Sequence, residues 1–280
     1  TGIMQDLYND TAYRTSALVT RTYSTSFSAA VRLLDREAQK AIYSIYGFVR
    51  FADEIVDTFH SHDKKELLEK FEKDYYDASE KGISLNPILH AFQLTVKHYS
   101  IPDDLIQAFM SSMKTDLYKQ NHESHGETAS YIYGSAEVIG LMCLKVFVRG
   151  DEKLYGELRE PARKLGSAFQ KVNFLRDIRD DTILLNRNYF HHSLANGFND
   201  EVKQLIVKDV EDEFAESLQG LKKLPPASRT GVLIAYLYYR KLLGKIKASP
   251  AEVLLKKRVR VPDYVKFFLL VKAYFVSRFM

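Results

Sequence analysis

Two short stretches of the sequence each place a pair of aspartates four residues apart among apolar neighbours. The first, VRFADEIVDT, contains Asp53 and Asp57, and the second, NFLRDIRDDT, contains Asp177 and Asp181. Residues four apart lie on one face of an α-helix, so each pair would present two carboxylates together. Like charges on an apolar helix are costly unless a cation compensates them. Two such pairs, each beside an arginine, are therefore not a chance surface feature.

These residue types suit a divalent cation that is bound to a diphosphate. Mg²⁺ prefers oxygen ligands and joins carboxylates to phosphate oxygens, and Mn²⁺ is an alternative with the same preference. The Asn173 amide stands one turn before Asp177. Arg50 and Arg176 supply guanidinium groups, which pair with phosphate oxygens in a bidentate way. Carboxylates, amide and arginines together predict a Mg²⁺–diphosphate clamp.

Other chemistries have little support in the sequence. The eight histidines show neither HExxH nor a Cys/His zinc spacing, and no P-loop, GxGxxG or GxSxG motif occurs. Ser24 and Ser26 are read as ligand-contacting hydroxyls or helix caps rather than nucleophiles. The single cysteine, Cys143 in VIGLMCLKVF, predicts a buried and inert thiol. It excludes an intramolecular disulfide and fits a reducing compartment, so we expect a cytoplasmic protein.

The elements that must position these groups read as helices. The 280 residues contain 13 glycines and 7 prolines without a low-complexity linker, and alternating strand patterns are scarce. We therefore expect one all-α domain over residues 1–280. Apolar residues recur at three and four positions over the segments expected to be helical, which are 35–58, 63–81, 86–99, 102–118, 127–149, 151–183, 198–222, 226–247 and 262–278.

The helix expected over 35–58 has two stripes. An apolar stripe predicts its core face, and a second stripe, rotated by about 100°, carries polar groups. Because the remainder is mostly apolar, we expect the polar stripe to face an interior cavity. That stripe contains Tyr43, Tyr46, Arg50, Asp53 and Asp57, and the helix over 151–183 repeats the design with Gln170, Asn173, Asp177 and Asp181.

The charge pattern restricts the partners. The net charge of +4 is mild, and the best basic run, LLKKRVRV, is short, so no nucleic acid is expected. No run reaches the roughly 18–20 apolar residues of a spanning helix. The stretch VKFFLLVKAYFVSRFM, which begins at Val265, mixes aromatic residues with Lys266, Lys272 and Arg278. It either lies on the inner surface of a membrane or packs into the core.

Five blocks in order carry a family resemblance. They are YSTSF (23–27), AIYSIYGFVRFADEIVD (41–57), YIYGSAEVIGLM (131–142), GSAFQKVNFLRDIRDD (166–181) and RNYF (187–190). The chain resembles the squalene/phytoene synthases, the head-to-head prenyl-diphosphate synthases, over nearly its whole length. The resemblance implies an isoprenoid-synthase bundle of helices around a deep central cavity, with one acidic motif on each facing wall.

The resemblance also implies roles for single residues. The metal ligands would be Asp53, Asp57, Asn173, Asp177 and Asp181. The diphosphate would contact Arg50, Arg176, Tyr46 and Gln170. The YSTS stretch, with Tyr23, Ser24, Thr25 and Ser26, resembles a mobile flap over the substrate, and Tyr239 falls near an active-site tyrosine.

One block departs from the pattern of many relatives, which read YYVAGTVG where this chain has YIYGSAEVIG. The active-site tyrosine would then be Tyr133 or Tyr131, and helix packing is the alternative role of both. The small residues of this block would leave room for a prenyl chain or would permit close contact between helices. They are Gly134, Ser135, Ala136 and Gly140.

The family reaction joins two allylic diphosphates through a cyclopropylcarbinyl diphosphate. Because the resemblance is greatest to bacterial carotenogenic enzymes, we expect geranylgeranyl diphosphate as substrate, phytoene as product and no use of NADPH. Squalene or dehydrosqualene formation from farnesyl diphosphate is the alternative. An elongase or terpene cyclase would carry DDxxD at Asp53, and a non-catalytic assembly factor would be expected to have lost the aspartates.

Overall fold

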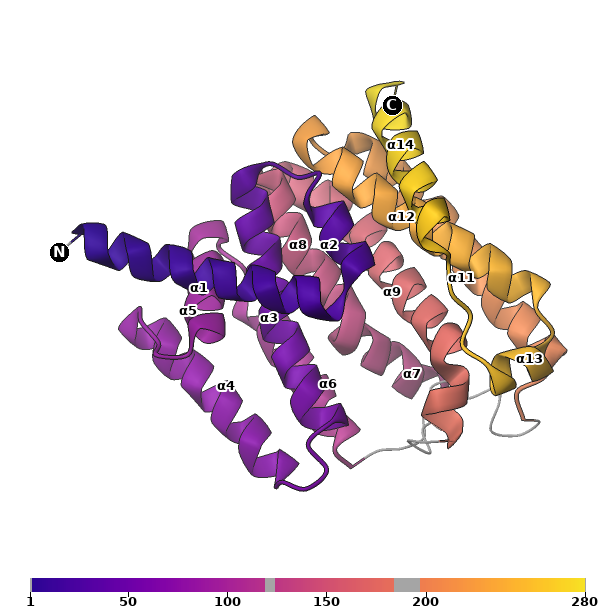
Figure 1. Cartoon of the computed structure of the whole chain (residues 1–280), viewed down its shortest axis with the longest axis horizontal. Coiled ribbons are helices and arrows are strands. Elements are labelled where there is room, and N and C mark those ends of the chain that lie inside the picture. Colours follow the sequence, from indigo (N-terminus) through magenta and orange to yellow (C-terminus); the bar gives the residue numbers. More distant parts are fainter. Residues whose placement is uncertain (1, 119–123, 184–196, 280) are drawn as a thin grey trace.

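The computed structural model describes residues 2–118, 124–183 and 197–279, and every regular element in these ranges is a helix (Figure 1). This confirms the all-α class. The RNYF block at 187–190, together with His191 and His192, lies outside the described residues.

The first half of the chain forms one side of the molecule. In chain order its helices are α1 (Gly2–Tyr23), α2 (Thr25–Val31), α3 (Arg36–Asp57), α4 (Lys64–Lys81), α5 (Pro87–Tyr99) and α6 (Asp103–Asp116). Figure 1 shows these elements grouped around α3, with the start of α1 extending away from the body.

The second half begins with α7 (His125–Ile132), the π-helical turn η1 (Tyr133–Glu137) and α8 (Val138–Val148), which follow one another as a single rod. The remaining helices are α9 (Glu152–Ile183), α11 (Asp200–Lys223), α12 (Pro226–Ala248), α13 (Ala251–Lys256) and α14 (Asp263–Phe279). Helix α9 packs on both α8 and α11, so it lies at the centre of this half.

The segments expected from the sequence are helical, with ends within two residues of the expected ends. Capping explains several of these ends, because Asp35, Asp63 and Asn199 each accept a hydrogen bond from a backbone N–H of the following first turn. Gly82 ends α4 with φ at 72°, a left-handed conformation that glycine adopts without strain.

Helices α1, α2 and α13 were not expected from the sequence. The core face of helix α1 is not evident from the apolar pattern, because two of its fully buried residues, Ser16 and Thr20, are polar. Each of these hydroxyls donates to the backbone carbonyl four residues earlier, so the polar groups are satisfied inside the helix. A periodicity search that counts only apolar residues does not detect such a helix.

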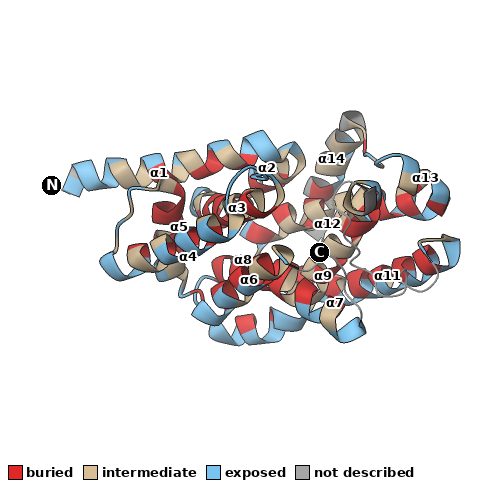
Figure 2. Ribbon diagram, turned by 90° about the horizontal axis from the view of Figure 1, so that it is seen from below, coloured by how far each residue is buried: buried red, intermediate tan, exposed pale blue. Residues whose placement is uncertain are grey.

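The buried side chains form two clusters. Figure 2 shows that the buried residues lie on the parts of the helices that face the interior. One cluster joins α3 to α4, α5, α6 and α8, with Phe48 and Phe92 stacked at its centre at 4.0 Å. The other joins α9 to α11 and α12. The rod from His125 to Val148 contributes to both clusters, and 61% of its most apolar stretch is buried. By length and composition alone this rod could cross a membrane, which the sequence analysis did not anticipate, but here it is a core helix.

Candidate active site

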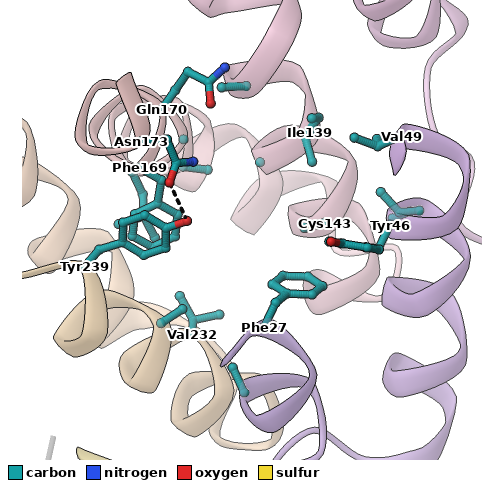
Figure 3. Close-up of a pocket in the computed structure, with 18 of the residues that line it drawn as sticks. Phe27, Tyr46, Val49, Ile139, Cys143, Phe169, Gln170, Asn173, Val232 and Tyr239 are labelled. Atoms are coloured by element: carbon teal, nitrogen blue, oxygen red, sulfur yellow. Dashed lines mark hydrogen bonds between the residues drawn. The ribbon is translucent and has the colours of Figure 1, made fainter. Parts of the chain in front are cut away.

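A cavity of about 690 Å³ lies between the two clusters. Helix α3 forms one wall and α9 another, and α2, η1, α8, α11 and α12 contribute further lining residues (Figure 3). The four aspartates of the two motifs line it near the C-terminal ends of α3 and α9. Towards the N-terminal end of α9 the lining is apolar. The cavity is therefore polar at one end and apolar along its depth.

On the α3 wall one arginine is shared by two acids. Arg50 donates from Nη1 to Asp53 Oδ2 at 2.7 Å and from Nε to Glu54 Oε2 at 3.1 Å. Although burial opposes the charged guanidinium, these two carboxylates raise the pKa of Arg50. The Tyr23 ring covers the guanidinium at 4.4 Å. Asp57 lines the cavity one turn further along.

On the α9 wall one acid is shared by two arginines. Asp177 Oδ1 accepts from Arg176 Nε at 3.0 Å and lies 2.7 Å from Arg258 Nε. Arg258 comes from the segment between α13 and α14, so the tertiary fold brings it to the wall. Burial opposes the charge on Arg176, but Asp177 raises its pKa above the ordinary value. Asp181 also lines the cavity.

Aromatic side chains follow the charged groups. Tyr46 stacks on Phe27 at 5.0 Å, and burial raises the pKa of Tyr46 to about 12. On the other side Tyr239 donates from its hydroxyl to Asn173 Oδ1 at 3.2 Å and stacks on Phe169 at 4.1 Å (Figure 3). Ring faces favour cations, so these residues suit a cationic intermediate.

The structure places Tyr131, and not Tyr133, on the cavity wall. The Tyr131 hydroxyl donates to Asp116 Oδ2 at 2.7 Å, and Asp116 lines the cavity as well. Tyr133 instead lines a smaller pocket of about 300 Å³ between α6 and α7. Of the two tyrosines that the sequence left open, the geometry favours Tyr131. Asp116 was missed because a lone acid at a helix end has no spacing that marks it.

Only part of the expected flap, residues 23–26, lines the cavity. Tyr23 and Ser24 line the cavity, whereas Thr25 and Ser26 are not among its lining residues. Ser24 is also the N-cap of α2, because its hydroxyl accepts from Phe27 N at 3.2 Å. Both readings of Ser24 as ligand-facing hydroxyl and as cap thus agree with its position. Tyr43 is buried and is likewise not part of the lining.

The small residues of the 134–140 block serve two purposes. A Cβ at Gly134 would stand 2.7 Å from Ala108 O, and one at Gly140 would stand 3.0 Å from Ala162 O. Both glycines thus permit close helix contact, although Gly140 also lines the cavity. Ser135 and Ala136 line it too, and Gln170 Nε2 donates to Ser135 Oγ at 3.4 Å.

Cys143 lies on the cavity wall rather than in the core. Burial raises the pKa of its thiol to about 12, so the thiol stays protonated at neutral pH. The expectation of an inert thiol agrees with this pKa, and the position of the side chain makes it part of the apolar lining.

The acidic groups of the two motifs are distributed over two walls. Among the described residues no three acidic, histidine or cysteine side chains form one compact metal-binding group. Each wall instead offers a pair of carboxylates next to an arginine, with Asn173 on the α9 side. This donor set suits a cation held between the protein and an anionic ligand that lies between the walls.

Comparison with known proteins adds the family. The model of the squalene/phytoene synthase family matches residues 20–264. The chain is 27% identical to phytoene synthase 2 of Oryza sativa subsp. japonica over 256 residues, which are 85% of this chain and 64% of that protein. It is 24% identical to 4,4'-diapophytoene synthase of Staphylococcus haemolyticus over 268 residues, 89% of this chain and 91% of that protein. The chain thus spans less than two thirds of the rice protein.

The fold also has solved counterparts. A dehydrosqualene synthase crystallised with a ligand superposes with a TM-score of 0.84 at 19% identity, covering 97% of this chain and 98% of that one. At this identity the likeness concerns the fold, and it confirms the helical bundle around a central cavity.

Proposed function

The chain belongs to the squalene/phytoene synthase family of head-to-head prenyltransferases, and we propose that it joins two molecules of geranylgeranyl diphosphate into phytoene. The observation that carries the proposal is the division of the cavity into a charged end and a long apolar remainder. Such a cavity matches a substrate with a diphosphate head and a hydrocarbon tail.

In this proposal the arginines bind the diphosphates. Arg50, Arg176 and Arg258 all line the charged end, and a guanidinium group can pair with two phosphate oxygens at once. Stabilising the departing diphosphate lowers the barrier to forming an allylic cation. In the structure these arginines are paired with carboxylates. On binding of the diphosphate the arginines would pair with phosphate oxygens instead, and the carboxylates would then be available to a metal ion.

The donor set fits Mg²⁺. Asp53, Asp57, Asp177 and Asp181 would hold the ion with the Asn173 oxygen, since hard cations prefer carboxylate and amide oxygens. Bound Mg²⁺ would neutralise charge on the leaving diphosphate. Mn²⁺ has the same ligand preference.

The apolar walls protect the cationic intermediate. Phe27, Phe169 and Val232 line the cavity beyond the charged end and offer no hydrogen-bond partner to water, which would quench a carbocation. Tyr46 and Tyr239 present ring faces there. The raised pKa values of both tyrosines keep their hydroxyls neutral.

The depth of the cavity leaves room for the longer substrate. Asp177 and Leu158 both line it from α9, and they lie ~28 Å apart along the helix axis. At ~1.2 Å per bond, a geranylgeranyl chain of four isoprene units extends ~20 Å and a farnesyl chain of three extends ~15 Å. The cavity therefore accommodates a geranylgeranyl chain along its length.

The alternative substrate is farnesyl diphosphate, which would give dehydrosqualene, or squalene with NADPH. Similarity to a diapophytoene synthase favours this alternative. Incubating the protein with C15 and C20 diphosphates, with and without NADPH, separates these reactions. Phytoene from the C20 substrate without NADPH is the expected result, and hydrocarbon from the C15 substrate alone would overturn the choice of substrate.

We also propose that α14 contacts an anionic membrane, which would receive the hydrocarbon product. Phe268 on this helix is 67% exposed, and Lys266 and Lys272 flank it in the sequence. Binding to vesicles that contain anionic lipid should weaken with salt and in the double variant Lys266→Glu/Lys272→Glu. Absence of binding at low salt would contradict this contact.

A further inference from the structure

The π-helical turn η1 is the irregular part of the rod that forms one wall of the cavity. The Val138 N–H donates to Tyr133 O, five residues earlier, whereas the helix on either side has the ordinary spacing of four. A π-turn inserts one extra residue and redirects the side chains beyond it, and such turns are frequent at functional sites. The turn needs contacts that hold it in this form.

Backbone contacts hold η1 between two helices. Gly134 faces α6, where an added Cβ would stand 2.7 Å from Ala108 O. On the other side Gly166 of α9 faces the turn, where an added Cβ would stand 2.9 Å from Ala136 O. These approaches leave no room for larger side chains at either glycine.

A charged contact spans the turn from its first residue to its last. Arg163 of α9 donates from Nε to Glu137 Oε2 at 2.6 Å, and its guanidinium carbon lies 5.4 Å from the centre of the Tyr133 ring. Tyr133 begins η1 and Glu137 ends it. The Glu137 side chain is only 14% exposed, so water screens this ion pair less than a surface pair.

Arg163 has a second acidic partner on its own helix. Its Nη1 donates to Glu160 Oε1 at 2.8 Å, but Glu160 is 68% exposed and lies on α9 itself. One arginine therefore makes one contact to the turn and one to a solvent-exposed acid. The two acids form a matched pair for an experiment.

The inner side of the turn faces the reaction space. Ser135 and Ala136 line the cavity, and Tyr131, two residues before η1, lines it next to Asp116. Rotation of the turn would move these side chains relative to the substrate. Displacements of about 1 Å near a reacting centre can cost 10²-fold in rate.

We propose that Glu137 and Arg163 form a clamp that sets the rotation of η1 and thereby positions Tyr131 and Ser135 on the cavity wall. Glu137 and Arg163 are positioning residues, because neither lines the cavity. The role rests on the proposed prenyl-transfer function. It predicts that loosening the clamp lets water reach the cation, so that more substrate leaves as prenyl alcohol and diphosphate.

The test compares Glu137→Gln with Glu160→Gln in the 280-residue chain. Glu137→Gln is expected to lower kcat by roughly tenfold or more with little change in KM, and to raise the fraction of prenyl alcohol. Glu160→Gln should behave as the unmodified protein. The charge-reversed double variant Glu137→Arg/Arg163→Glu should recover part of the lost rate, which a general loss of stability would not explain.

Amide hydrogen exchange provides a readout without turnover. Peptides covering residues 131–140 should exchange faster in Glu137→Gln than in Glu160→Gln, while peptides from α4 exchange equally in both. Equal exchange and equal kcat in the two variants would overturn the clamp. An unmodified protein that turns over neither C15 nor C20 diphosphate would overturn the proposed function instead, and the exchange comparison would still decide whether the clamp holds η1.

Discussion

The two acidic walls of the cavity distribute their charges in opposite ways. On α3 a single arginine, Arg50, is shared by Asp53 and Glu54, and Asp57 adds a further carboxylate to this wall. On α9 a single acid, Asp177, is shared by Arg176 and Arg258. Among these contacts of the described residues, the α3 wall has two acids for one arginine and the α9 wall has one acid for two arginines. We infer that the α3 wall contributes more to holding metal ions and the α9 wall more to holding diphosphate.

The largest expected effect is loss of turnover on removal of metal. Chelation with EDTA should abolish hydrocarbon formation and Mg²⁺ should restore it, because the carboxylates of both walls would then face the diphosphate without a cation. The comparison of the walls adds that Asp53→Asn should raise the Mg²⁺ concentration for half-maximal rate more than Arg258→Gln does. Full activity in EDTA would eliminate the metal site.

The second largest effect is expected from replacing single aspartates of the two motifs. Asp53→Asn and Asp177→Asn should each lower kcat by at least about 10²-fold, by analogy with removal of a preorganised electrostatic group. Steady-state kinetics with saturating Mg²⁺ measures this loss. Asp180→Asn is the matched control, since Asp180 is next to the motif but is not among the cavity-lining residues. Normal rates in either of the first two variants would assign that aspartate a structural role.

Substitutions of the aspartates on the two walls should differ in their effect on thermal stability. In Asp53→Asn, Arg50 keeps Glu54 as a partner and a crowded acidic wall loses one charge, so the melting temperature should be unchanged or higher. In Asp177→Asn two arginines lose their shared acid, so stability should fall by about 1 kcal/mol, or a few degrees in Tm. Scanning calorimetry without metal measures both. A change in melting temperature of similar size and the same sign in both variants would contradict the proposed difference between the two walls.

Substitutions in the apolar part of the cavity, beyond the charged groups of both walls, should change only the preference for substrate length. Helix α8 runs antiparallel to α9, since Gly140 faces Ala162, and this places Cys143 ~25 Å from the level of Asp177. Cys143→Phe should therefore depress C20 turnover more than C15 turnover, with Cys143→Ala as control. Gly140 also lines the cavity but is unsuitable as a test position, because a side chain there would first meet the α9 backbone. Equal losses with both substrates would count against the depth argument.

The smallest effect is expected on the rear face of α9. Glu213 is buried there beside Ser167 and Lys171, and its Oε2 has no hydrogen-bond partner among the described residues. Burial raises the pKa of this carboxyl above its ordinary value. The folded state then binds more protons than the unfolded state between the ordinary and the raised pKa, so stability falls as pH rises through that interval.

Glu213→Gln should remove this pH-dependent fall, and Glu216→Gln, a change at an exposed acid on the same helix, should keep it. Denaturant unfolding at several pH values between about 4 and 7 measures the difference. Parallel stability curves for the two variants would show that Glu213 does not titrate differently in the folded state.

The sequence by itself determined most of the helices, among them α3 and α9, and the two acidic motifs. Apolar residues at helical spacing mark the core faces of α3 and α9, and the same spacing aligns Asp53 with Asp57 and Asp177 with Asp181 on the cavity side. These features were predictable because hydrophobic burial and helix geometry act within a few residues of one another along the chain.

Only the tertiary structure decided which other residues join them. Arg258 and Asp116 reach the cavity from segments whose local sequence has no motif. Tyr131 rather than Tyr133 faces it, because residues two apart on a helix point about 200° apart and the packing of the rod decides which of them faces the cavity. Gly134 permits contact with α6 rather than extra room for substrate. The physical reason is that these positions depend on how helices far apart in the chain pack together, and local periodicity contains no information on the rotation or separation of two packed helices.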